Sequence, residues 1–206
     1  MTPESTPQQH APVEVPAHTL AAKAATATLR LFGWRVVSAP VIAPKAVVVI
    51  YPHTSNWDFM IGVLARAVLR LPMFWIGKES LFRFPMRTLM TWLGGTPVDR
   101  SKSHGLVDQL RTVVERHQSY FLVITPEGTR RRTDHWKSGF YHVARGLDVP
   151  VGLAFIDYGR RQVGIAEWMR LSGDEDQDLS HIREIYATRQ GRYPALAGDI
   201  RFRDKS

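Results

Sequence analysis

The residues Ala46-Val-Val-Val-Ile-Tyr51, followed by Pro52-His-Thr-Ser-Asn-Trp-Asp58, carry the strongest indication of fold in this chain. A continuous run of β-branched residues is typical of a strand buried on both faces, as in parallel sheets. Residues 57–70 then read as a helix that is apolar nearly all round. A buried strand that leads through a short polar loop into a helix is the repeating unit of α/β proteins.

The same alternation continues along the chain. Strands are predicted over 73–76, near 96–98, over 120–125 and over 149–155, and helices from about Pro85, over 103–117 and over 136–145. Alternating strands and helices predict an α/β fold with a mixed, largely parallel sheet flanked by helices. The acidic stretch at 174–178 is expected to be a solvated loop before a last helix.

The N-terminal region differs from the rest in composition. Residues 1–17 are rich in Pro, Gln and Thr and are predicted to be disordered, whereas 18–206 should form a single domain. Residues 18–37 read as a helix with three basic residues, either an interfacial anchor or a helix packed on its own domain. No uninterrupted apolar run approaches the ~18 residues of a spanning helix, and no typical signal peptide is present, so a cytoplasmic location is expected.

Charge and cysteine content narrow the classes of partner and chemistry. The 206 residues carry a formal net charge of +8, which favours anionic partners such as a phospholipid surface, a phosphorylated metabolite or nucleic acid. No recognised nucleic-acid motif accompanies the charge, so no nucleic-acid partner is expected. The chain has no cysteine, which excludes disulfides, thiolate catalysis and thiolate metal sites.

The first candidate site is the pair His53 and Asp58, directly after the 46–51 strand. On one continuous helix, residues five apart point about 140° from each other, so the pair meets only if His53 lies in the preceding loop. The carboxylate could then orient the imidazole as a general base. Alternatively, Ser55-x-x-Asp58 is a capping box with an acid suited to the helix dipole. The spacing alone does not separate these interpretations.

Two further segments place charged residues at predicted strand ends. Thr125-Pro-Glu-Gly-Thr-Arg130 is a tight turn whose backbone N–H groups could hold an oxyanion or a phosphate. The alternative is a polar surface turn with a Glu127–Arg130 pair. Gly95-Thr-Pro-Val-Asp-Arg100 delivers another arginine, which by itself is more typical of a surface residue than of a ligand.

Taken together, these segments resemble the glycerolipid acyltransferases typified by 1-acylglycerol-3-phosphate acyltransferases. His53 and Asp58 match the family's His-x4-Asp block, the strand to Arg100 matches its second block, and Pro126 to Arg130 match its Pro-Glu-Gly-Thr-Arg block. The fourth block is a partial match, since Val149-Pro150 is present but Leu153 stands where the family has a second proline. The blocks occur in family order over residues 45–156.

The resemblance implies a glycerol-phosphate acyltransferase-like fold and a direct acyl transfer in phospholipid synthesis or remodelling. His53 would be the general base and Asp58 its orienting partner. Arg100 and Arg130 would bind phosphate, while Glu127, Gly128 and Thr129 would shape the turn around the acceptor. The donor would be acyl-CoA or acyl carrier protein, the acceptor a lysolipid, first of all lysophosphatidic acid, and no metal or cofactor is implied.

Such an enzyme must reach a lipid surface. Residues 71–93 interleave aromatic and basic side chains, which is favoured at a lipid headgroup interface but equally suits a protein core. We therefore expect peripheral association with the inner face of the membrane. The alternatives are a non-enzymatic membrane or anionic-lipid binder, an acyltransferase for a different acceptor, and a hydrolase that uses the same His–Asp pair on water.

Overall fold

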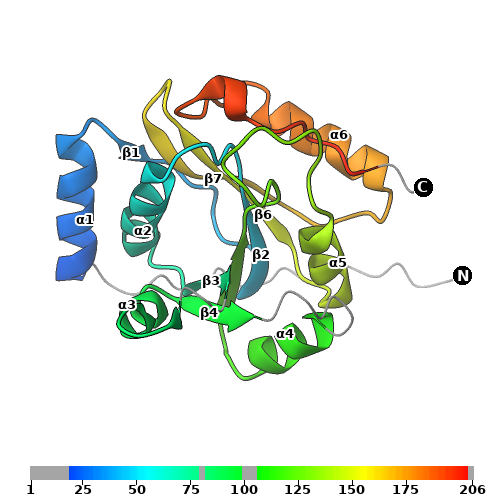
Figure 1. Ribbon diagram of the computed structural model, residues 1–206, viewed down its shortest axis with the longest axis horizontal. Coiled ribbons are helices and arrows are strands. Elements are labelled where there is room, and N and C mark those ends of the chain that lie inside the picture. Colours follow the sequence, from blue (N-terminus) through cyan, green and yellow to red (C-terminus); the bar gives the residue numbers. More distant parts are fainter. Residues whose placement is uncertain (1–18, 79–81, 99–105, 204–206) are drawn as a thin grey trace, which may run out of the picture.

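The computed structural model describes residues 19–78, 82–98 and 106–203, and these ranges form a seven-stranded sheet with helices on both faces (Figure 1). The predicted disordered segment 1–17 lies outside the described residues. The strands are β1 (Arg35–Val36), β2 (Lys45–Ile50), β3 (Met73–Lys78), β4 (Gly95–Val98), β5 (Tyr120–Ile124), β6 (Val151–Asp157) and β7 (Gln162–Met169). The helices are α1 (Leu20–Leu31), α2 (Trp57–Leu69), α3 (Met86–Trp92), α4 (Leu106–Glu115), α5 (Gly139–Gly146) and α6 (Glu175–Tyr186), with a short 3-10 turn at Pro194–Leu196.

Strand β2 lies at the centre of the sheet, whose order is β1-β7-β6-β2-β5-β3-β4. It pairs in parallel with β5 and with β6, so that Val47 lies opposite Leu122 and Val151. Val47 belongs to one core cluster and Val48 to another, and both are fully buried. The predicted mixed, largely parallel sheet flanked by helices is confirmed. Because neighbouring parallel strands end at the same edge, the segments that follow β2, β5 and β6 come together there.

The strands β7 and β1, of which β7 forms the antiparallel part of the sheet, were not predicted. β7 returns beside β6 and pairs with β1 in parallel. Gly164 and Glu167 interrupt the apolar residues of β7, and a register shift between Leu153 and Ala154 of β6 adds a further irregularity. Neither a continuous apolar run nor strict alternation therefore marks β7, and β1 is only two residues long.

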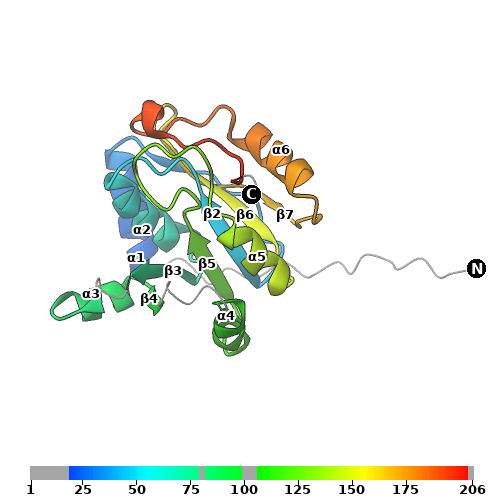
Figure 2. The ribbon, with the colours of Figure 1, turned by 45° about the vertical axis from the view of Figure 1, so that its right-hand side comes forward.

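The helices cover the two faces of the sheet in separate groups (Figures 1 and 2). Leu29 of α1 and Ile61 of α2 share a buried cluster with β6 and β7. Phe140 of α5 and Ile182 of α6 pack with α4 on the opposite face, against Val47 of β2. The loop between β2 and α2 thus leaves the sheet toward the side covered by α1 and α2.

The N-terminal helix is shorter than the predicted range 18–37. It ends because Gly33 adopts a left-handed conformation with φ of +75°, which allows two closing hydrogen bonds. Trp34 N–H donates to the Leu29 carbonyl at 2.8 Å and Gly33 N–H to the Arg30 carbonyl at 2.9 Å, the Schellman pattern of a helix end. In the described part of the chain, no helix combines the length and apolar character needed to cross a bilayer.

The prediction of a solvated loop at 174–178 is wrong, because these residues begin α6. The Asp174 side chain caps the helix by accepting N–H groups of Asp176 and Gln177, each at 3.1 Å. Asp178 is buried and accepts the hydroxyl of Tyr141 at 2.7 Å. Acidic residues at a helix start complement the helix dipole, so this cluster stabilises α6.

Candidate active site

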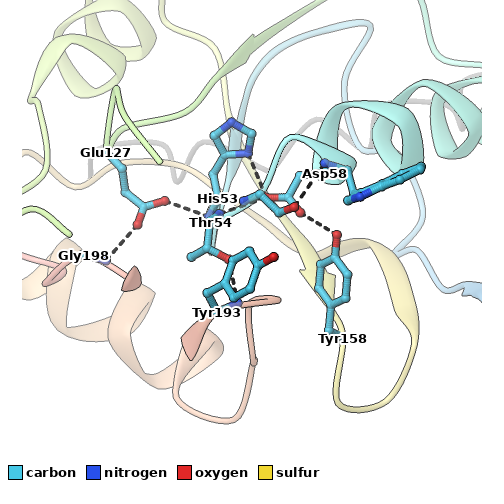
Figure 3. A network of polar contacts seen from close by, with 9 residues as sticks. His53, Thr54, Asp58, Glu127, Tyr158, Tyr193 and Gly198 are labelled. Carbon is cyan, nitrogen blue, oxygen red and sulfur yellow. Dashed lines mark hydrogen bonds and ion pairs between the residues drawn. The ribbon is translucent and has the colours of Figure 1, made fainter. Parts of the chain in front are cut away.

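The His53 imidazole meets the Asp58 carboxylate where β2 ends (Figure 3). His53 lies in the loop between β2 and α2, and Asp58 in the first turn of α2. The distance from Nδ1 of His53 to Oδ2 of Asp58 is 3.2 Å. The two side chains converge because the histidine precedes the helix, as the sequence analysis required. The structure brings the predicted pair together, and its catalytic role stays a prediction.

Asp58 is held in a buried hydrogen-bond network. Its side chain is 1% exposed, and Oδ2 also accepts the backbone N–H groups of Thr54 and Ser55, both at 2.9 Å. Oδ1 accepts the hydroxyl of Tyr158 at 2.7 Å. Burial by itself raises the pKa of Asp58, but the hydrogen bonds from His53, Tyr158 and Ser55 outweigh it and hold the pKa below its ordinary value. Asp58 is therefore a carboxylate at neutral pH.

The capping interpretation of this motif holds only in part. The Asp58 carboxylate accepts the N–H of Ser55, as in a capping box, but Ser55 Oγ accepts the N–H of Trp57 at 3.2 Å and the N-cap of α2 is Asn56. One carboxylate thus fastens the start of α2 and orients the imidazole at the same time. Within the described residues no hydrogen bond occupies Nε2 of His53, whose side chain is 14% exposed. That nitrogen is free to accept a proton from a substrate.

Glu127 of the Pro-Glu-Gly-Thr-Arg turn points inward toward the same loop (Figure 3). Its Oε2 accepts the backbone N–H of His53 and its Oε1 that of Gly198, each at 2.8 Å. Burial raises the pKa of Glu127, although the two backbone N–H groups partly oppose this shift. Among the described residues no ion pair joins Glu127 to Arg130, because Glu127 faces the backbone of the site.

The last three residues of this turn, Gly128 to Arg130, are exposed. Gly128 has φ of +64°, and a Cβ there would lie 2.9 Å from Nζ of Lys137, so the turn requires glycine. Thr129 Oγ1 accepts the N–H of Arg131 at 3.2 Å, and Arg130 is exposed. Two cations, Arg130 and Lys137, therefore flank the turn. The second predicted phosphate ligand, Arg100, lies outside the described residues.

Comparison with protein families agrees with this geometry. The model of the Acyltransferase family matches residues 34–152, more than half of the chain. That range holds His53, Asp58 and the turn at 126–130. The chain belongs to the Acyltransferase family.

Comparison with solved structures supports the same assignment at the level of fold. This acyltransferase is similar to the crystal structure of the 1-acyl-sn-glycerophosphate (LPA) acyltransferase PlsC from Thermotoga maritima, with a TM-score of 0.52 and 17% sequence identity. The match covers 84% of this chain and 80% of that chain. None of the curated proteins matches the chain significantly. The resemblance to glycerolipid acyltransferases is confirmed.

Two parts of the site were missed by sequence reasoning, and both lie after the range that matches the family. Tyr158 follows β6 directly, and this position at a strand end was the signal that could have found it. The segment 190–198 crosses the site, where Tyr193 N–H donates to Thr54 Oγ1 at 3.2 Å and Gly198 N–H to Glu127. No local pattern in that segment predicts these long-range contacts.

An apolar hollow runs along α2 on its sheet side. Its lining includes Ile50 of β2, Gly62 and Ala65 of α2, and Ile156 of β6. Gly62 lies one helical turn after Asp58 on the same face of α2. The hollow has a volume of only about 30 Å³, and its lining does not include His53 or Asp58. A Cβ at Gly62 would meet no atom within 4 Å. The acyltransferase therefore has a small apolar cavity between α2 and the sheet.

Proposed function

We propose that this acyltransferase moves a fatty acyl group from acyl-CoA or acyl carrier protein to a hydroxyl of a lysolipid, in phospholipid synthesis or remodelling. One observation carries the proposal. Nδ1 of His53 lies 3.2 Å from a buried carboxylate of lowered pKa, and Nε2 is left for the substrate. This is the arrangement that a histidine base needs in order to take a proton from an alcohol.

The proposed reaction is a direct transfer between the two substrates. Nε2 of His53 takes the acceptor's hydroxyl proton as the oxygen attacks the thioester carbonyl carbon, and the Asp58 carboxylate stabilises the resulting imidazolium. The tetrahedral intermediate then collapses, the C–S bond breaks, and the imidazolium returns its proton to the thiolate. A positioned base contributes about 10²–10⁴-fold, so alignment of the two substrates must supply much of the rest.

The chemistry needs no covalent acyl-enzyme. The chain contains neither cysteine nor a Gly-x-Ser-x-Gly nucleophile motif. The thioester itself carries the activated acyl group, so the proposal requires no metal and no cofactor besides the donor.

We favour lysophosphatidic acid as the acceptor because cations flank the turn beside the candidate base. Arg130 is exposed there, and the amino group of Lys137 lies beside the backbone of Gly128. A guanidinium suits a phosphate because it can donate two parallel hydrogen bonds. Arg100 stands at the family's other phosphate-binding position. The Thermotoga maritima protein of similar fold is described as an LPA acyltransferase, which agrees with this choice.

The acyl chain of the donor is proposed to enter the apolar hollow along α2. A chain in this position would run between α2 and the sheet, and the small cavity there would have to widen as the chain binds. Because Gly62 leaves the space open, the residue at position 62 would influence how much of an acyl chain fits. Burial of each methylene group contributes about 0.8 kcal/mol, so this contact would favour long-chain donors.

The enzyme is proposed to act at the inner face of the membrane as a peripheral protein. Helices α1, α2 and α3 lie along one side of the molecule in both views (Figures 1 and 2). Large exposed apolar residues occur on or next to these helices, namely Leu20, Leu31, Phe32, Trp57, Met60, Phe84, Met86, Leu89 and Trp92. Lys23, Arg30, Arg83 and Arg87 are exposed in the same elements, as an anionic lipid surface would favour.

The decisive experiment measures free thiol released by purified protein from acyl-CoA or acyl carrier protein in the presence of a panel of lysolipids. We expect release that depends on the acceptor and is fastest with lysophosphatidic acid. Release without any acceptor would identify a hydrolase, and release with neutral acceptors only would reassign the substrate. His53→Ala should abolish turnover while lipid binding persists. Lipid binding by a wild-type protein that releases no thiol would identify a non-enzymatic binder.

A further inference from the structure

Tyr158 contacts the one oxygen of Asp58 that His53 does not use. Tyr158 follows β6 at the start of the turn into β7, and its hydroxyl donates to Oδ1 of Asp58 at 2.7 Å. His53 and Tyr158 thus approach the carboxylate from two sides (Figure 3). Among the described residues, the Tyr158 hydroxyl is the donor to Oδ1. Oδ2 instead faces the imidazole and accepts two backbone N–H groups.

Tyr158 is itself held in place by two other parts of the chain. Its backbone N–H donates to the Gln190 carbonyl at 2.8 Å, in the segment that crosses the site. Its ring meets the Trp34 ring edge-on, with centroids 5.0 Å apart and an interplanar angle of 88°. Trp34 also closes the end of α1. The phenol therefore has a defined direction, set by segments that are distant in sequence.

The fixed position of the Tyr158 hydroxyl matters because the Asp58 carboxylate could otherwise rotate about its Cβ–Cγ bond. Burial and the neighbouring Asp58 charge raise the pKa of Tyr158 well above its ordinary value, so the phenol keeps its proton and remains a donor at neutral pH. A fixed donor on Oδ1 opposes rotation and leaves Oδ2 directed at Nδ1. The carboxylate can then fix the imidazole tautomer that keeps Nε2 unprotonated.

We propose that Tyr158 is a positioning residue for the general base, acting through Asp58. The proposal rests on the proposed acyl-transfer function. Tyr158 lies beyond the 34–152 range that matches the family, so the role comes from the C-terminal part of this chain. The family match therefore gives no information about Tyr158, and its positioning role follows from the hydrogen bonds around Asp58.

The first test is Tyr158→Phe, which keeps the ring and its contact with Trp34 but removes the donor. We expect kcat to fall about 10- to 100-fold, the range that loss of a hydrogen bond to a charged group supports, with both KM values nearly unchanged. Tyr141→Phe is the matched control. It removes the same kind of bond, a tyrosine hydroxyl that donates to a buried aspartate at 2.7 Å, but it does so between α5 and α6 on the opposite face of the sheet, so its kcat should stay at the wild-type level.

A double-mutant cycle separates positioning from a merely structural role. In an Asp58→Asn background the imidazole has lost its carboxylate, so Tyr158→Phe should lower kcat no further. An equal loss in both backgrounds would overturn the proposal, as would an unchanged kcat for the single variant. Thermal unfolding of each variant checks that the fold persists.

A measurement without substrate keeps this proposal distinct from the proposed function. Nitrogen-15 NMR of the His53 imidazole reports which ring nitrogen carries the proton. We expect the Nδ1–H tautomer to dominate in the wild type and to lose population in Tyr158→Phe. If this shift occurs in a protein that transfers no acyl group, the proposed function fails and the positioning role stands. Identical tautomer populations in the two proteins would overturn the positioning role.

Discussion

Glu127 holds the backbone of His53, since its Oε2 accepts the His53 N–H at 2.8 Å. The other oxygen of this buried carboxylate accepts the Gly198 N–H at the same distance. Glu127 follows β5 and His53 follows β2, which are neighbouring parallel strands. One side chain therefore joins the turn at 126–130, the loop of the candidate base and the C-terminal segment.

Glu127→Gln should lower kcat by about tenfold or more, because an amide offers only one acceptor oxygen and would turn an NH₂ group toward a backbone N–H. A buried donor left without its acceptor costs ~1–3 kcal/mol, enough to displace the His53 loop. Thiol release measures the effect. Glu167→Gln is the control, since Glu167 pairs with His181 at the surface. A kcat equal to that of the control would contradict the role given to Glu127.

Asp58→Asn should remove a pH-dependent part of the folding stability. Because the pKa of Asp58 is lowered in the folded protein, its ionised form stabilises the fold above the unfolded pKa of about 3.9. This contribution is lost as the pH falls through the lower folded pKa. Urea unfolding should show a larger difference in unfolding free energy between wild type and variant at neutral pH than in strong acid. A difference that does not change with pH would refute the lowered pKa.

Arg130→Ala should raise the KM for lysophosphatidic acid about tenfold or more, with little change in the KM for the acyl donor. The reason is the loss of a charge-assisted hydrogen bond to the acceptor's phosphate. Arg131→Ala is the matched control, being the adjacent exposed arginine. If the KM for the donor rises instead, Arg130 binds the phosphates of the donor. Equal effects of both substitutions would indicate that only the total positive charge of this surface matters.

Gly62→Leu should shift the preference among donors toward shorter acyl chains. The new side chain would occupy space that is open at Gly62 and would shorten the hollow along α2. Turnover of a series of acyl-CoA donors from short to long measures the shift. The short donors are an internal control, since their rates should stay close to those of the wild type. A uniform loss at every chain length would place the acyl chain elsewhere.

Combined replacement of Phe84 and Trp92 by Ala should weaken binding to anionic vesicles about tenfold or more. Both side chains are largely exposed on or next to α3, at 96% and 77%, and aromatic residues favour the headgroup region. Sedimentation with vesicles that contain phosphatidylserine measures binding. Tyr193→Ala is the control, an exposed aromatic residue outside α1 to α3. Unchanged binding would remove α3 from the proposed membrane-facing side.

The central strand, the loop and the start of α2 could be predicted because their determinants are local. The β-branched run before Tyr51 and the polar residues from His53 to Asp58 specify strand, loop and helix within thirteen residues. The antiparallel strand β7 could not be found, because a glycine and a glutamate interrupt its apolar pattern. The acidic start of α6 was misread because composition does not distinguish a capped helix start from a solvated loop.

The amino-acid order alone was sufficient to predict the fold class and to identify the acyltransferase motifs with His53 and Asp58 as candidates, whereas their contact came from the structure. The direction of Glu127 toward the His53 backbone and the contact from Tyr158 to Asp58 depend on the assembled sheet. These contacts span 74 and 100 residues, and they form because parallel neighbours of β2 end at the same edge. Hydrogen bonds between such distant residues leave no periodic trace in a sequence, so they emerge only when the strands pair.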